Sequence, residues 1–187
     1  YPDLIGVGED EFRPGIVHRL DKDVSGLMVV ARTQKMFDHL KKQFQERTVT
    51  KEYTGLVHGV IDDEERSINT PIGRSQTKSG KMAAHTGEFE GDRDAKTEYK
   101  VLDRIKNYTL LQVTIHTGRT HQIRVHLNSI EHPVVGDTLY TNKRIKRKNL
   151  GRIFLHASKL GFKNLDQEQK KYESELPKDL KTFLSSF

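Results

Sequence analysis

The segment IVHRLDKDVSGL, residues 16–27, holds a carboxylate in a setting where it could do chemistry. Asp21 follows a cation, Arg19, and precedes residues 22–26, which are rich in turn-forming types. A carboxylate placed in this way can be a turn residue, a member of an ion pair, or a nucleophile or electrostatic stabiliser at a reacting centre. The segment alone leaves these three interpretations open.

A second segment, TGRTHQIRVHL at 117–127, contains an arginine whose role is also open. Gly118 favours a turn, and Ile123 and Leu127 have the spacing of the buried stripe of a short helix. Arg124 is adjacent to Ile123 and therefore lies at the edge of that stripe. Such an arginine is either a surface residue whose stem covers apolar neighbours, or a planar fork aimed at a carboxylate or a phosphate.

Tyr53 lies in KEYTGLVHGVI, residues 51–61, an alternating segment that predicts a strand. An aromatic residue in a strand usually packs in the core. Stacking on a nucleic-acid base is the alternative interpretation. The strand pattern does not decide between core packing and stacking.

Three histidines, His116, His121 and His126, recur every five residues and suggest a metal site at first sight. Zinc-binding helices place histidines four residues apart, as in H-E-x-x-H, and neither that motif nor a D-x-D-x-D cluster occurs. Glycine-rich dinucleotide-binding and phosphate-binding loops do not occur either. We therefore expect no metal and no cofactor.

The charge balance is consistent with a polyanionic partner. The chain has 32 Lys and Arg against 26 Asp and Glu, a net charge of +6, and a pI near 9.4. The run KRIKRK at 143–148 together with Arg152 places six cations in ten residues. The absence of cysteine excludes disulfides, thiolate nucleophiles and cysteine-based zinc sites. No apolar run is long enough to cross a membrane.

The patterns along the chain predict an α+β fold in a single domain, 1–187, with a mostly antiparallel mixed sheet flanked by helices and loops. A buried strand is expected at LMVVA (27–31), and Thr33 is expected to cap a helix beginning at residue 34. We expect Thr120 to cap a second short helix that His132–Pro133 ends. The remaining expectations are strands at 51–61, 97–105, 108–118 and 154–162, a hairpin or long loop at 73–96, and a weak helix after Pro177.

In combination, these segments resemble the RNA pseudouridine synthases, in particular the bacterial ribosomal large-subunit type. The resemblance covers residues 13–162 in the order that the family has. The matching stretches are RPGIVHRLDKDVSGLMVVART (13–33), QFQERTVTKEYTGLVHG (43–59), PIGR, KM and AKTEYKVL (71–102), HTGRTHQIRVHL (116–127), HPVVGDTLY (132–140) and FLHASKLGF (154–162).

The resemblance implies isomerisation of uridine to pseudouridine within RNA, in ribosomal RNA first and transfer RNA second. It implies that Asp21 is the catalytic carboxylate and that Arg124 is its guanidinium partner. Tyr53 is implied to lie against the target uracil, and Arg19 to fill the space left by the flipped base or contact the backbone. Ile123 and Leu127 are expected as apolar pocket walls or core.

We expect phosphate contacts from the basic run and from cations of the long loop. The candidates are Lys78, Lys81, Lys143, Arg144, Lys146, Arg147, Lys148 and Arg152. The protein is expected to be a cytoplasmic monomer with RNA as its partner and no membrane contact. Relatives usually have Thr at the position of Val24, and we expect the loop to survive this loss of a hydroxyl.

Relatives usually begin with additional strands, often after an S4-like domain, and we expect both to be absent from this chain. Two other functions compete with the synthase. One is a catalytically silent RNA-binding relative, and the other is an N-glycosylase that releases the base by the same carboxylate chemistry.

Overall fold

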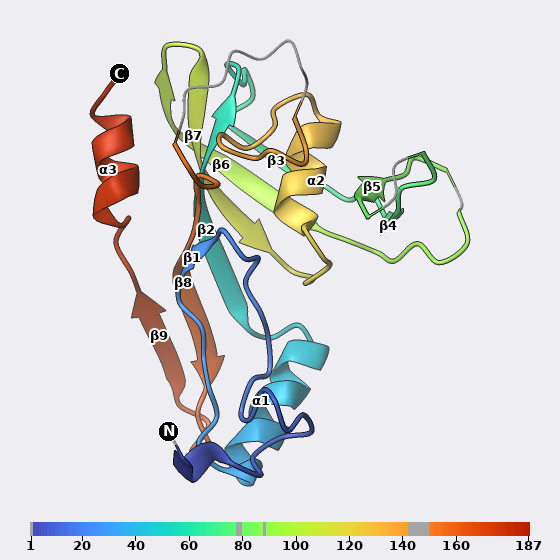
Figure 1. Cartoon of the computed structure of the whole chain (residues 1–187), viewed down its shortest axis with the longest axis vertical. Coiled ribbons are helices and arrows are strands. Elements are labelled where there is room, and N and C mark those ends of the chain that lie inside the picture. Colours follow the sequence, from blue (N-terminus) through green and yellow to red (C-terminus); the bar gives the residue numbers. More distant parts are fainter. Residues whose placement is uncertain (1, 78–79, 88, 142–149) are drawn as a thin grey trace.

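The computed structural model describes residues 2–77, 80–87, 89–141 and 150–187. A seven-stranded mixed sheet, antiparallel except where β1 meets β8, confirms the predicted fold class (Figure 1). Its order is β1-β8-β2-β7-β6-β3, and β9 pairs with β8. The strands are β1 (Ser25–Gly26), β2 (Thr50–His58), β3 (Glu65–Ile68), β6 (Thr97–Ile105), β7 (Tyr108–Ile115), β8 (Leu155–Lys163) and β9 (Gln169–Glu173).

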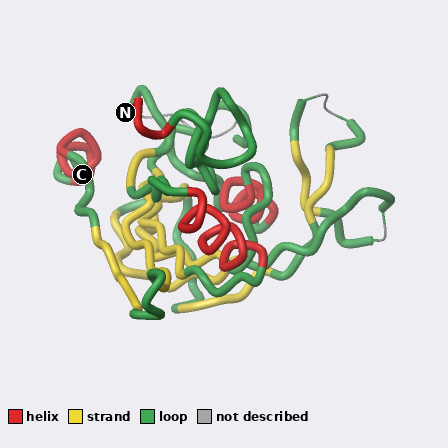
Figure 2. Tube along the Cα trace, turned by 90° about the horizontal axis from the view of Figure 1, so that it is seen from below, coloured by secondary structure: helices red, strands yellow, loops and turns green. Residues whose placement is uncertain are grey.

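Helices lie on both faces of this sheet. Helices α1 (Gln34–Gln45) and α2 (Gln122–Ser129) lie on one side, as Figures 1 and 2 show. Helix α3 (Lys178–Leu184) packs Leu180 and Phe183 against Leu56 and covers the opposite face. A separate hairpin of β4 (Ile72–Arg74) and β5 (Met82–Ala84) projects from the sheet beside α2. A short 3-10 helix (Pro2–Leu4) begins the described chain.

The central strand β2 carries Tyr53 into the face that α2 covers. Tyr53 is opposite Val113 of β7 on one side and Ala157 of β8 on the other. The apolar residues of this face form the largest core cluster, together with Ile123 and Leu127 of α2. Alternation along β2 therefore places the next residue, Thr54, on the other face from Tyr53.

The predicted buried strand at 27–31 is wrong. Only Val30 forms an isolated bridge, to Ile16, and Met28 and Val30 are exposed. The edge of β8 that would receive these residues is occupied from Lys159 onward by β9, which the sequence analysis did not predict. The apolar run is therefore extended but largely unpaired.

The first predicted helix is confirmed, since the Thr33 hydroxyl oxygen accepts a hydrogen bond from the Met36 amide at 3.2 Å. The cap of α2 differs from the prediction. Thr120 does not cap it; His121 occupies the N-cap position in the left-handed conformation, with φ 56°, and no side chain accepts a capping hydrogen bond there. The strand pair joined at Lys106–Asn107, the late strand and the helix after Pro177 occur as predicted.

Candidate active site

A tight turn presents Asp21 just before β1. The Val24 amide donates to the Asp21 carbonyl at 3.0 Å, which closes the turn, and Val24 packs against the main core. The loop therefore forms without a hydroxyl at position 24, as expected. Gly26 then lies against β8 with φ +122°, and a Cβ there would approach the Ala157 carbonyl oxygen to 2.3 Å. Glycine is needed at this contact because any side chain would push the Asp21 loop away from the sheet.

A buried residue, Gln122, anchors the first turn of α2, the helix that carries Arg124. The Gln122 carbonyl oxygen accepts from the Thr117 hydroxyl and the Arg119 amide, at 2.7 and 3.0 Å. Its amide group donates to the Lys96 carbonyl and the Thr97 hydroxyl, both at 3.0 Å. Gln122 therefore ties the loop before α2 to β6 and fixes where the helix begins.

The Arg124 guanidinium joins two carboxylates that are far apart in sequence. Its Nη1 lies 3.0 Å from Asp21 Oδ2, and its Nε and Nη2 lie 2.6 and 3.1 Å from the two oxygens of Asp137. Arg124 is 6% exposed and Asp137 is 2% exposed. Burial alone would lower the pKa of Arg124, but Asp137 and then Asp21 outweigh it and raise this pKa, so the cation is permanent.

Asp137 is a residue that the sequence analysis did not single out. It also accepts the amides of Leu139 and Tyr140, at 2.8 and 2.9 Å, so its carboxylate is fully hydrogen-bonded. The Tyr140 ring lies under the guanidinium, with 5.1 Å between Arg124 Cζ and the ring centroid. The signal that could have identified it is the GDTLY segment. An aspartate at the start of a turn commonly accepts hydrogen bonds from the backbone amides two and three residues later.

The Tyr53 side chain is buried beside this ion pair. Only 8% of Tyr53 is exposed, and it borders the same pocket as Asp21. Burial, and then the negative charge of Asp21, raise the pKa of Tyr53 to about 12. The phenol is therefore neutral near pH 7 and can donate a hydrogen bond. Its burial in the main core cluster agrees with core packing, and stacking on a base stays a prediction.

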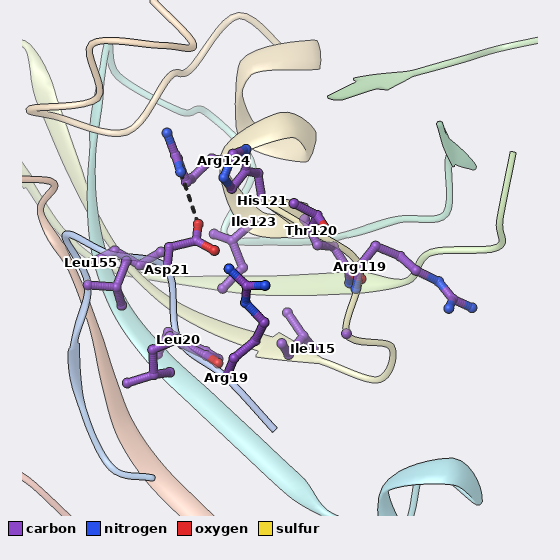
Figure 3. Close-up of a pocket in the computed structure, with 14 residues that line it drawn as sticks. Arg19, Leu20, Asp21, Ile115, Arg119, Thr120, His121, Ile123, Arg124 and Leu155 are labelled. Atoms are coloured by element: carbon purple, nitrogen blue, oxygen red, sulfur yellow. Dashed lines mark hydrogen bonds and ion pairs between the residues drawn. The ribbon is translucent and has the colours of Figure 1, made fainter. Parts of the chain in front are cut away.

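A pocket of about 110 Å³ lies over the Asp21–Arg124 pair. In Figure 3, one Asp21 oxygen points to Arg124 and the other toward the cavity, and the Arg19 side chain reaches in beside them. Ile123 lines this pocket, whereas Leu127 is fully buried in the core and is not among its lining residues.

His121 lines the pocket beside Arg124 (Figure 3). Its Nδ1 lies 2.9 Å from the Tyr140 hydroxyl, which in turn accepts the Met82 amide. Burial and the charge of Arg124 lower the pKa of His121. The other two histidines of the series point elsewhere, since His116 contacts Glu98 and His126 contacts Thr97.

Of the predicted phosphate-binding residues, the structure describes two. Lys81 donates to the Leu139 carbonyl, and Arg152 donates to the Ser25 hydroxyl at 2.7 Å and pairs with Asp179 at 3.3 Å. Both therefore have partners within the protein and help to hold loops near the site. The other candidates lie outside the described residues: Lys78, Lys143, Arg144, Lys146, Arg147 and Lys148.

Comparisons with known proteins bear on the family to which the chain belongs. A family model described as RNA pseudouridylate synthase matches residues 6–129. An uncharacterised RNA pseudouridine synthase of Synechocystis is 44% identical, over 86% of this chain and 49% of its own length. A ribosomal large subunit pseudouridine synthase D of Neisseria meningitidis serogroup B is 40% identical, over 92% of this chain and 48% of its own.

A solved structure, human RNA Pseudouridylate Synthase Domain Containing 1, superposes with a TM-score of 0.77 at 31% identity. The match covers 87% of this chain and 69% of that one. The chain spans about half the length of the curated relatives that it matches. No helix among the described residues is both long and apolar enough to cross a bilayer. The family model covers well over half of the 187 residues, and the chain therefore belongs to the RNA pseudouridylate synthase family.

Proposed function

We propose that this chain isomerises uridine to pseudouridine within RNA, with Asp21 as the catalytic carboxylate. The observation that carries the proposal is the Asp21–Arg124 ion pair at the floor of a pocket that Tyr53 also borders. Three segments distant in sequence supply these side chains. An ion pair with only a structural role would not need its second carboxylate oxygen to point away from the arginine among the residues that line a pocket, which is the arrangement in Figure 3.

The reaction breaks the bond between N1 of uracil and C1′ of ribose and forms a bond between C5 and C1′. The proton of C5 leaves and N1 gains one, so no group is added or lost. A carboxylate serves this chemistry as a nucleophile or as a stabiliser of cationic sugar character. Arg124, fixed by Asp137, orients the Asp21 carboxylate beside the pocket through its hydrogen bond to Oδ2.

The remaining pocket residues suit a base that has left its stack. Flipping a nucleotide costs a few kcal/mol, which contacts in the pocket must offset. The Tyr53 ring provides an aromatic surface for uracil, and Arg19 is an exposed cation at the mouth of the pocket. Ribosomal RNA is the first choice of substrate because several relatives bear the name ribosomal large subunit pseudouridine synthase D; transfer RNA is the second.

The test is release of tritium from large-subunit ribosomal RNA transcripts that carry uridine labelled at C5. We expect tritium in water, and pseudouridine in the digested RNA in equal amount. Free uracil without pseudouridine would favour the N-glycosylase. RNA binding with neither product, on ribosomal or transfer RNA, would favour a silent relative.

A Tyr53→Phe substitution separates the aromatic ring from its hydroxyl. We expect isomerisation to slow by about 10²-fold, because the neutral phenol is then lost as a proton donor near the reacting base. RNA affinity should stay within about threefold, because the stacking surface remains. Single-turnover tritium release and equilibrium binding measure the two effects.

Tyr99→Phe is the matched control for this substitution. Tyr99 is 3% exposed and lies opposite Val113, as Tyr53 does on the other side of β7, but it does not line the pocket. Its variant should isomerise uridine at the normal rate. Equal losses in the two variants would assign the effect to packing of the sheet and not to the Tyr53 hydroxyl.

A further inference from the structure

A second cleft, of about 340 Å³, adjoins the candidate active site. The two cavities share Arg19, Tyr53 and Arg119 among their walls, so they form one continuous depression. Arg47 and Lys51 line only the second cleft. No aspartate or glutamate is among the described residues that line it. We call this feature the basic cleft.

Lys51 is the unusual member of the basic cleft. Only 9% of the residue is exposed, yet among residues 2–77, 80–87, 89–141 and 150–187 no carboxylate or carbonyl is found within ion-pair or hydrogen-bond distance of its ammonium. Its Nζ lies 5.9 Å from the centroid of the Phe44 ring. A largely buried ammonium without an anion is unfavourable, because its partial desolvation is not offset by a partner.

The neighbours of Lys51 add positive charge and supply no carboxylate among the described residues that line the cleft. Burial, and then the positive charge of Arg47, lower the pKa of Lys51 to about 8. Arg47 itself sits in the left-handed conformation, with φ 59°, directly after α1. The other wall is His18, which stacks on Phe44 at 4.7 Å and whose pKa is lowered to about 4 by burial and by Lys51. The cleft is therefore lined by arginines and Lys51, and His18 beside them is neutral near pH 7.

Strand geometry places Lys51 of the basic cleft beside Tyr53, the residue proposed to stack on the target base. Lys51 and Tyr53 are two apart on β2, so both point to the same face and their Cα atoms are about 6–7 Å apart. Arg19 stands between the two cavities, since it lines both. An anion bound beside Lys51 would therefore lie next to a base stacked on Tyr53, as a backbone phosphate lies next to the base of a neighbouring nucleotide.

We propose that the basic cleft binds a backbone phosphate of single-stranded RNA next to the nucleotide whose base enters the Asp21 pocket. Lys51 supplies the buried positive charge, and Arg19 and Arg47 supply exposed contacts. Only the identity of the anion as an RNA phosphate rests on the proposed function. The phosphate would supply the partner that the Lys51 ammonium lacks among the described residues.

Salt dependence of RNA binding tests this site. The probe is a nine-nucleotide oligouridylate, with binding measured by fluorescence anisotropy on the 187-residue chain between 50 and 300 mM salt. Lys51→Met should reduce the slope of log K against log salt by about 0.7, the value for one phosphate contact on a single strand, and weaken binding about fivefold at 0.1 M salt. Lys51→Arg should keep the slope of the unmodified chain.

Lys171→Met is the matched control. Lys171 is an exposed lysine on β9, outside both cavities, and its substitution changes the net charge equally. Its slope should stay that of the unmodified chain. Equal changes in the Lys51 and Lys171 variants would overturn the site, because they would report net charge alone.

Two further readouts separate this proposal from a structural role and from the proposed function. Lys51→Met should unfold at the same or a higher urea concentration than the unmodified chain. A large drop in that concentration would reveal an internal partner of Lys51 and overturn the site.

Tritium release by the unmodified chain is measured in parallel with the salt dependence. An unchanged slope in a chain that isomerises uridine overturns the cleft alone. A lowered slope in a chain that releases no tritium supports the cleft and rejects the proposed function.

Discussion

On the proposed function, Asp21→Asn is expected to abolish tritium release, with a loss of about 10⁴-fold or more, the size that removal of an essential catalytic group produces. The amide keeps the shape of the carboxylate, so Arg124 still has an acceptor at 3.0 Å and remains bound to Asp137. It lacks the negative charge that, in the proposed reaction, attacks or stabilises the sugar. Single-turnover release from labelled ribosomal RNA gives the rate, and urea unfolding gives the stability.

Asp23→Asn is the control for this substitution. Asp23 lies in the same turn, two residues on, but it is exposed and does not line the pocket. Its variant should release tritium at the normal rate, although it loses an equal charge from the same loop. Undiminished release by Asp21→Asn would reject the carboxylate chemistry. A comparable loss in both variants would indicate that the turn, and not the Asp21 carboxylate, matters.

The sequence predicts the elements that local patterns determine. The Thr33 cap, the alternation of β2 and the pair of strands around Lys106–Asn107 all depend on residues that are neighbours in the chain. The segment 27–31 failed because its pairing depends on β9, more than 130 residues away, which occupies the edge of β8. Apolar β-branched composition alone cannot identify which strand edges are free.

In the site, too, features set by local sequence were predicted, and features that depend on contacts between distant segments were not. Asp21, Tyr53 and Arg124 were expected from the family resemblance, and the structure brings them to one pocket. Spacing alone left Arg124 as a surface residue or a fork aimed at an anion, and only its burial against Asp137 distinguishes them. Lys51 was also missed, because a lysine in a strand carries no signal until its neighbours show that it is buried without a carboxylate among the described residues.

Asp137 is expected to stabilise the fold and to position Arg124, although we assign it no contact with substrate. Asp137→Ala leaves Arg124 with one carboxylate in place of two and leaves the Leu139 and Tyr140 amides without their acceptor. Breaking a buried ion pair in this way costs about 3–5 kcal/mol of unfolding free energy. Urea unfolding measures this cost.

The surface pair of Arg152 with Asp179 provides the matched comparison for stability. Asp179 is 48% exposed at its side chain and lies 3.3 Å from the arginine. Asp179→Ala should cost at most about 1 kcal/mol, because solvent screens an exposed pair. Similar costs at Asp137 and Asp179 would contradict the buried network as the source of rigidity in the site.

The milder Asp137→Asn variant tests the positioning role in a folded protein. The amide can accept from the Leu139 and Tyr140 amides, but it offers Arg124 no second negative charge, and its nitrogen cannot accept from the guanidinium. Arg124 is then free to move relative to Asp21, and displacements of about 1 Å at a reacting centre cost about 10²-fold in rate. We therefore expect kcat to fall by about 10²-fold while KM for ribosomal RNA changes less than about threefold. A purely structural role predicts instead that the folded fraction turns over at the normal kcat, and that result would remove Asp137 from the catalytic network.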